Sequence, residues 1–140
     1  MRFTDDELSD IYDRTSGYCH LCHKKLSFKN YGRLRARGNW EVEHSHPQVH
    51  GGTHRLNNLY AACIACNRSK GAFTTRTARK WSGNTKAPLS RSKRRQAKTK
   101  AAVATGIFGA AIGGAIGGPP GAWIGGALGA RLGYKANPDR

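Results

Sequence analysis

Acidic residues are scarce in this chain, with 8 Asp and Glu against 24 Lys and Arg in 140 residues and a formal net charge of +16. The shortage of acid leaves a positive field, which attracts polyanions such as nucleic acid or an anionic lipid surface. The chain also lacks an apolar run after its acidic N-terminal segment, residues 4–7. We therefore expect no secretory signal and a reducing, cytoplasmic location.

The charge divides the sequence into three parts. Residues 1–83 carry 14 basic and 7 acidic side chains, residues 84–100 carry 7 bases and no acid, and no residue from 101 to 130 is charged. Pro88 lies in the second part, and the third is apolar and rich in Gly. We predict a globular domain over 1–83, a flexible basic linker over 84–100, and a separate apolar segment with its tail over 101–140.

Cysteine is also sparse, and its four positions are spaced for a metal. Cys19 with Cys22, and Cys63 with Cys66, form two Cys-x-x-Cys pairs separated by 40 residues. Such pairs complete the tetrahedral shell of a structural zinc, and a globular part of about 80 residues needs such a staple because its core is small. The alternatives are a disulfide pair, an iron–sulfur centre or free thiols; the reducing location favours zinc.

The pattern of apolar residues predicts an α+β domain. Thr4 and Glu7 form a capping box before an amphipathic helix over 5–15. Large apolar and acidic residues alternate over 40–44, which indicates a strand; residues 48–57 are predicted to form a loop, and residues 59–62 a returning strand. A basic helix is expected from Asn67 toward Trp81.

Several residues in this stretch together resemble the HNH endonuclease family in its four-cysteine zinc form. They are Glu43-His44-x-x-Pro47, Gly51-Gly52, Asn58-Leu59, Cys63-x-x-Cys66-Asn67 and Lys70. The resemblance covers residues 19–71, extends toward 5–81, and does not reach the last 40 residues. It implies a ββα-metal core, which agrees with the expected order of strand, loop, strand and helix.

The resemblance also implies a catalytic site for phosphodiester hydrolysis. His44 would be the general base, and Asn58 would brace the loop that orients it. Glu43 and Asn67 would hold a catalytic divalent ion, which their oxygen ligands suit to Mg2+ or Mn2+. His46 is either a further metal ligand or a surface histidine.

The chemistry of these side chains supports the roles and sets one condition. An imidazole with an ordinary pKa near 6.5 accepts a proton at neutral pH. Adjacent strand residues point to opposite faces, so Glu43 and His44 share one site only if the strand ends or bends at residues 45–47.

The basic side chains around this site predict double-stranded DNA as the partner, cut with little sequence specificity. Phosphate contacts position a duplex without reading its sequence. The candidates are Arg55, Arg68, Lys70, Arg76, Arg79 and Lys80. The alternative function is a non-catalytic zinc module that binds nucleic acid.

The apolar segment has a regular pattern of small residues. Glycine recurs every four residues from Gly109 to Gly133, opposite bulky apolar side chains, and Pro119-Pro120 separates two arms, 102–118 and 121–134. This resembles a glycine zipper and predicts a helical hairpin. We expect either self-association or attachment to an anionic membrane at its cytoplasmic face; a soluble Gly-rich tail is the alternative.

Overall fold

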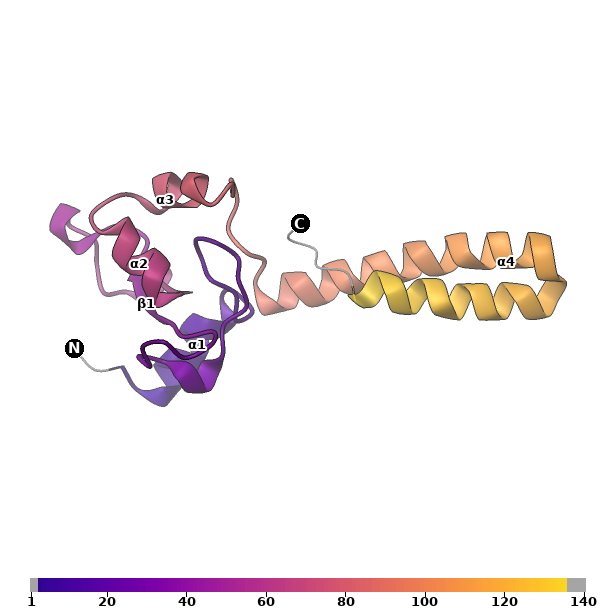
Figure 1. The fold of residues 1–140 in the computed structure, drawn as a ribbon, viewed down its shortest axis with the longest axis horizontal. Coiled ribbons are helices and arrows are strands. Elements are labelled where there is room, and N and C mark those ends of the chain that lie inside the picture. Colours follow the sequence, from indigo (N-terminus) through magenta and orange to yellow (C-terminus); the bar gives the residue numbers. More distant parts are fainter. Residues whose placement is uncertain (1–2, 136–140) are drawn as a thin grey trace. The chain divides into compact units, whose positions relative to one another are not determined.

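The computed structural model describes residues 3–135, and within the last helix it leaves out the side chains of residues 109, 112–114, 116–122, 125, 133 and 135. The helices and strands are α1 (Asp5–Asp13), β1 (Glu41–His44), β2 (Leu59–Ala62), α2 (Ile64–Lys70), α3 (Thr75–Trp81) and α4 (Arg91–Lys135) (Figure 1). Single 3-10 turns lie at η1 (Phe28–Asn30), η2 (Gln48–His50) and η3 (Leu56–Asn58). The chain forms two compact units, Met1–Arg91 and Ser92–Arg140.

Helix α1 begins at the predicted capping box. The Thr4 hydroxyl accepts from the backbone N–H of Glu7, and the Glu7 carboxylate accepts from the backbone N–H of Thr4 at 2.8 Å. These bonds satisfy donors that a helix start otherwise leaves unpaired. Leu8 and Ile11 are the buried residues of the helix, so its apolar face meets the core as the pattern predicted.

The two predicted strands form an antiparallel hairpin. β1 pairs with β2 so that Glu43 lies opposite Tyr60 and His44 lies opposite Leu59. Because opposite residues share a face, His44 is on the face of buried Leu59, and Glu43 is on the other face. The observed order of strand, loop, strand and helix confirms the predicted α+β class.

The single helix predicted over residues 67–81 is instead two helices. α2 begins directly after Cys63, and Gly71 ends it with a φ of 50°, a conformation that only glycine adopts at little cost. Thr74 then caps α3, since its hydroxyl accepts from the backbone N–H of Thr77. The glycine within the basic run was the sequence signal for this break.

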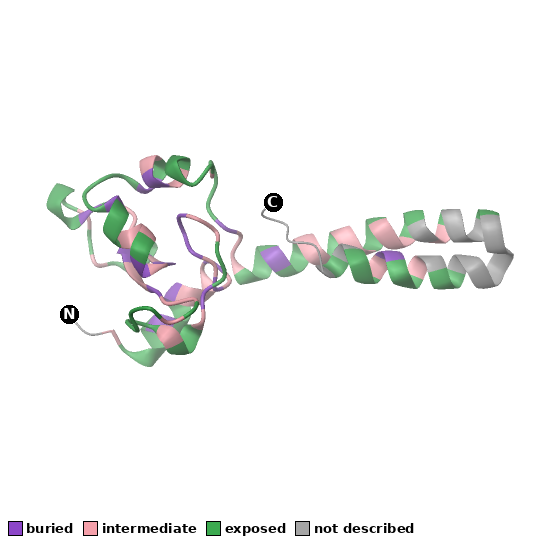
Figure 2. Ribbon diagram, viewed as in Figure 1, coloured by how far each residue is buried: buried purple, intermediate pink, exposed green. Residues whose placement is uncertain are grey.

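The core of the first unit lies between α1, the hairpin and the segment that carries the first cysteine pair. Its largest fully buried side chain is Trp40, whose indole N–H donates to the carbonyl of Phe28 at 3.2 Å. Tyr12 packs on the same ring, with centroids 5.3 Å apart. Purple segments in Figure 2 mark where this unit is buried. The hydrophobic cluster is small, because a short chain buries little apolar surface, and it holds the hairpin against α1.

Helix α4 begins at Arg91, so residues 91–100 are helical where a flexible linker was expected. The reason is composition, because Lys, Arg, Gln and Ala all favour helix when no Gly or Pro intervenes. Further along, α4 turns back on itself and its arms run side by side (Figure 1). A side chain on Gly106 would meet Ala130 at 3.3 Å, and one on Gly129 would collide with the carbonyl of Thr105. The arms therefore approach at positions where small residues leave room.

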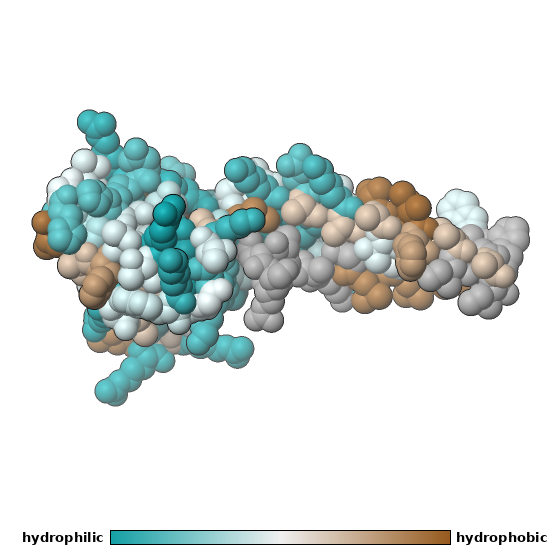
Figure 3. Space-filling view, turned by 90° about the horizontal axis from the view of Figure 1, so that it is seen from above, coloured by the Kyte–Doolittle hydropathy of each residue, from teal (hydrophilic) through white to brown (hydrophobic). Residues whose placement is uncertain are grey.

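Most of the predicted glycine stripe lies outside the described side chains: Gly109, Gly113, Gly117, Gly121, Gly125 and Gly133. Bulky apolar side chains stand on the surface of α4, as Figure 3 shows in brown, and Trp123 is 80% exposed. Among the described residues, no helix has the length and apolar character needed to cross a membrane.

Candidate metal centre and active site

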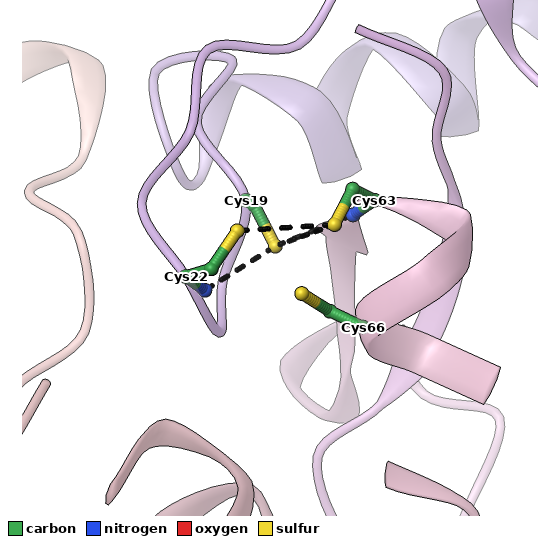
Figure 4. Close-up of side chains that lie close together, drawn as sticks. All are labelled: Cys19, Cys22, Cys63 and Cys66. Carbon is green, nitrogen blue, oxygen red and sulfur yellow. Dashed lines mark hydrogen bonds between the residues drawn. The ribbon is translucent and has the colours of Figure 1, made fainter. Parts of the chain in front are cut away.

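The four cysteines meet although 40 residues separate the pairs. Cys19 and Cys22 lie on the turn after α1, and Cys63 and Cys66 lie at the start of α2 (Figure 4). All four sulfurs lie within 4.8 Å of one another, and Cys63 Sγ is 3.8 Å from the sulfurs of both Cys19 and Cys22. A tetrahedral zinc with Zn–S bonds of about 2.3 Å needs sulfurs about 3.8 Å apart. The cluster therefore fits a structural zinc ion.

The local backbone also favours thiolates at this cluster. The N–H groups of Leu21, Cys22 and Cys63 point to Cys19 Sγ at 3.3–3.5 Å. The pKa values of the Cys22 and Cys63 thiols are lowered, first by the hydrogen bond that each shares with Cys19, and the pKa of Cys19 is raised, first by its hydrogen bond with Cys22. Since the thiolate is the form that binds metal, these four side chains could hold zinc and tie α2 to the turn after α1.

His44 ends β1 in regular pairing, and its ring meets a second histidine. His44 Nε2 and His54 Nδ1 are 2.6 Å apart, and the two rings stack with centroids 4.7 Å apart. Burial lowers the pKa of His44, and the neighbouring His54 lowers it further. His54 lies in the loop between β1 and β2, and no spacing in the sequence pointed to this contact.

Asn58 holds the loop that follows β1. Its Oδ1 accepts from the backbone N–H of His46 at 2.7 Å, and its Nδ2 donates to the carbonyls of His46 and Thr53 at 3.0 and 2.8 Å. A side chain on Gly52 would collide with the His46 carbonyl. The loop is thus closed on itself beside His44, with the His46 side chain exposed.

Glu43 lies in a different environment from His44. Its carboxylate is fully buried, accepts from the Thr75 hydroxyl at 2.9 Å and pairs with the Lys70 ammonium at 3.2 Å. Lys70 also donates to the His44 carbonyl at 2.9 Å. Burial raises the pKa of Glu43, and Lys70 and Thr75 oppose that shift. The pairing of β1 stays regular through His44 and the chain bends only after it, so Glu43 and His44 remain on opposite faces.

Asn67 contacts a carboxylate other than the predicted one. Its Nδ2 donates to Glu41 Oε1 at 3.0 Å, whereas Glu43 is held by Lys70 and Thr75. Asn67 Nδ2 and Glu43 Oε1 therefore contact different groups, and Glu43 Oε2 is buried without a hydrogen-bond partner among the described residues. His44 and Asn67 do line one open pocket of about 230 Å3. The remaining described residues that line it are Val42, Pro47, Gln48, Val49, Lys70, Gly71 and Ala72.

A second polar cluster lies behind Glu43, and no motif or spacing along the chain pointed to it. His20 is buried, stacks on Tyr60 with centroids 3.8 Å apart, and its Nε2 is 4.0 Å from the Glu43 carboxylate. Burial lowers the pKa of His20 to about 2, and Arg79 adds to that effect. The Arg14 guanidinium covers Tyr60 at 4.2 Å from its centroid. The neutral imidazole therefore links the first cysteine pair to the hairpin.

The predicted phosphate-binding side chains fall into two groups. Lys70 is 2% exposed and paired with Glu43, so its ammonium is not placed for the expected phosphate contact. Arg79 is half-buried and donates from Nε to the His20 carbonyl at 2.9 Å, so its guanidinium is held inside the domain. The exposed candidates are Arg55, Arg68, Arg76 and Lys80.

Comparison with known proteins agrees with this arrangement. The HNH endonuclease family model matches residues 19–73, which span both cysteine pairs, the hairpin and α2. No curated protein and no solved structure matched the chain. The match supports a nuclease-type hydrolase in general, and the four-cysteine cluster corresponds to the zinc form of the family. Residues 19–73 therefore form a domain of the HNH endonuclease type.

Proposed function

We propose that this protein is a divalent-metal-dependent endonuclease that hydrolyses double-stranded DNA with little sequence specificity. The observation that carries the proposal is the position of His44. It lines an open pocket together with Asn67 of α2, next to a loop that Asn58 braces. A base placed beside an open pocket on a positively charged domain is what hydrolysis of a phosphodiester requires.

In this proposal His44 takes a proton from the attacking water. Its lowered pKa keeps the ring neutral at pH 7, and the hydrogen bond to His54 fixes the ring plane. The water oxygen then bonds to phosphorus while the bond to the 3′ oxygen breaks, and the leaving 3′ oxygen takes a proton from solvent water. The products are a 5′-phosphate and a 3′-hydroxyl.

The proposed ion is Mg2+ or Mn2+, which would offset the charge that builds on the phosphate during hydrolysis. Asn67 lines the pocket and offers an oxygen ligand, whereas Glu43 is not among the described residues that line it, and its Oε1 is held by Lys70 and Thr75. His46 is exposed on the adjacent loop and remains a candidate ligand.

Plasmid nicking with added Mg2+ or Mn2+ tests the function. We expect wild type to convert supercoiled plasmid to the open circle, and His44→Ala to lose at least about a hundredfold in rate, the contribution of a general base. His50→Ala is the matched control, because His50 lies in the same loop region and is exposed. Equal rates for wild type and His44→Ala would refute the proposal.

The alternative function is a zinc module that binds nucleic acid without cutting it, since the cysteine cluster suits either function. It predicts salt-dependent DNA binding that His44→Ala leaves unchanged and no cleavage with either ion. A wild-type protein that binds plasmid tightly and never nicks it would favour this alternative.

We also propose an association role for α4, supported by its exposed apolar side chains, among them Ile107, Phe108 and Trp123. The partner is either a second copy of the chain or an anionic membrane surface at the cytoplasmic face. Flotation of the full chain with phosphatidylserine vesicles tests the membrane, and sedimentation without lipid tests self-association. A protein that sediments as a monomer and does not float with the vesicles would refute both self-association and membrane attachment.

A further inference from the structure

Two aromatic side chains stand exposed on the α2–α3 segment. Phe73 follows α2 and is 58% exposed, and Trp81 ends α3 and is 54% exposed. Their rings meet edge to face, with centroids 5.3 Å apart and an interplanar angle of 78°. In such a pair each ring keeps at least one face free. The two rings thus form a fixed apolar surface that faces solvent.

The core does not explain this pair. α3 packs inward through Thr75 and Ala78, which are its buried residues. The backbone at Phe73 is nonetheless held, because its N–H donates to the Lys70 carbonyl at 3.0 Å. An ordered aromatic pair outside the core is the kind of surface feature that marks a binding site.

The charge around the pair is positive. Arg76 and Lys80 lie one helical turn apart on α3, and both are exposed. Within residues 3–135, neither Arg76 nor Lys80 is part of the ion pairs that the acidic side chains form. Apolar partners without charge would gain nothing from these bases, whereas a polyanion with flat rings would use both features.

We propose that Phe73 and Trp81 form a stacking platform for unpaired nucleobases, so that the chain engages DNA with a single-stranded stretch beside the cleavage site. In a duplex the base faces are stacked on one another, and only unpaired or splayed bases can stack on a side chain. The inference rests on the proposed endonuclease function and narrows its substrate.

The position of the platform fits this use. Gly71 and Ala72 line the pocket that contains His44 and Asn67, and Phe73 follows them directly in the chain. A strand stacked on Phe73 and Trp81, with its phosphates on Arg76 and Lys80, therefore passes close to the pocket.

Tryptophan fluorescence of the full chain provides the test. Trp40 is fully buried and Trp123 lies on α4, so in a Trp123→Phe background Trp81 is the exposed tryptophan. The probes are a 20-nucleotide oligothymidine and a blunt-ended, fully paired duplex of similar length, used without added Mg2+ in a His44→Ala background. We expect oligothymidine to quench Trp81 strongly and the duplex to quench it little.

Affinity measured by anisotropy of labelled DNA completes the test. Trp81→Ala and Phe73→Ala should each weaken binding of oligothymidine by roughly 5- to 150-fold, the range for loss of one stacked base, and change duplex binding less than about twofold. Leu34→Ala, at an exposed apolar residue elsewhere in the unit, is the control and should change neither.

Equal weakening of both probes, or of neither, would overturn the platform. So would a change of oligomeric state in Trp81→Ala at unchanged DNA affinity, because the pair would then be a protein interface. None of these measurements requires cleavage. The binding measurements can therefore refute the stacking platform without refuting the nuclease activity, and the nicking assay can refute the nuclease activity without refuting the platform.

Discussion

Replacing Lys70 by Met removes one charge from a buried ion pair and keeps a side chain of similar length. The Lys70 and Glu43 side chains are 3% and 0% exposed, and the ammonium also holds the His44 carbonyl. Removing one partner of a buried pair costs about 3–5 kcal/mol, since the other charge is left without compensation. We expect Lys70→Met near the lower end, because Glu43, with its raised pKa, can take up a proton.

A double-mutant cycle isolates the pair itself. Glu43→Gln should also cost about 3 kcal/mol because it leaves Lys70 buried without its carboxylate. The double variant Lys70→Met with Glu43→Met replaces both charges by apolar groups and should recover most of the loss, with a coupling of about 2–3 kcal/mol. The cycle uses the single variants Lys70→Met and Glu43→Met, because these two changes make up the double variant. Glu43→Gln is measured beside them.

Thermal and urea unfolding with zinc present measure the effect. A loss of about 3 kcal/mol in a domain of this size lowers Tm by about 12–24 °C. Asp13→Asn is the matched control, since Asp13 pairs with Arg91 at 2.8 Å but the two side chains are 43% and 77% exposed; such a pair is worth about 0–1 kcal/mol. If Lys70→Met costs no more than Asp13→Asn, the buried position of the ammonium is wrong.

Three further predictions follow from the site. Cys63→Ser should lower the bound zinc measured by mass spectrometry and reduce folded stability, because one of the four sulfurs is lost; a fully folded variant without zinc would contradict the structural role. Asn58→Ala should lower the nicking rate more than it raises the DNA Kd, since it frees the loop beside His44; an unchanged rate would remove the bracing role. In the pH profile of nicking, the acid limb of wild type should lie below pH 6.5, because the lowered pKa keeps His44 in its neutral, basic form there. His54→Ala should move that limb to higher pH, since His54 helps to lower the pKa of His44. A wild-type acid limb above pH 6.5 would contradict this prediction.

Much of the domain could be predicted from local sequence signals. The two cysteine pairs indicated one cluster, and their sulfurs lie within 4.8 Å of one another. The alternation over residues 40–44 indicated β1, and the capping box indicated the start of α1. Each of these signals depends on spacing along the chain, which the sequence contains in full.

The direction of side chains toward distant partners could not be predicted in the same way. Glu43 and Asn67 were expected to share an ion, but each contacts a different group, because the partner of a strand residue depends on how α2 and α3 pack on the hairpin. The contact of His44 with His54 depends on the path of a loop with no periodic pattern. The stacking of His20 on Tyr60 joins residues far apart in the sequence, and neither segment contains a motif that predicts the contact.

The distribution of acids explains which bases remain for DNA. Glu41 and Glu43 both contact α2: Glu41 contacts Asn67, and Arg68 at 3.8 Å, and Glu43 contacts Lys70. Since no acid follows until Asp139, the exposed bases face solvent in a positive field. Four phosphate contacts would contribute about −3.6 to the slope of log affinity against log salt, about −0.9 for each.

Measured on a short duplex between about 50 and 200 mM KCl, that slope distinguishes exposed bases from buried ones, because each phosphate contact releases about 0.9 ions. Alanine at Arg55, Arg68, Arg76 or Lys80 should each reduce its magnitude by about 0.9. Lys70→Met, measured below its Tm, should leave the slope unchanged because Lys70 is buried against Glu43. A reduction by Lys70→Met equal to that of Arg76→Ala would mean that Lys70 reaches the phosphates, and that the ion pair opens when DNA binds.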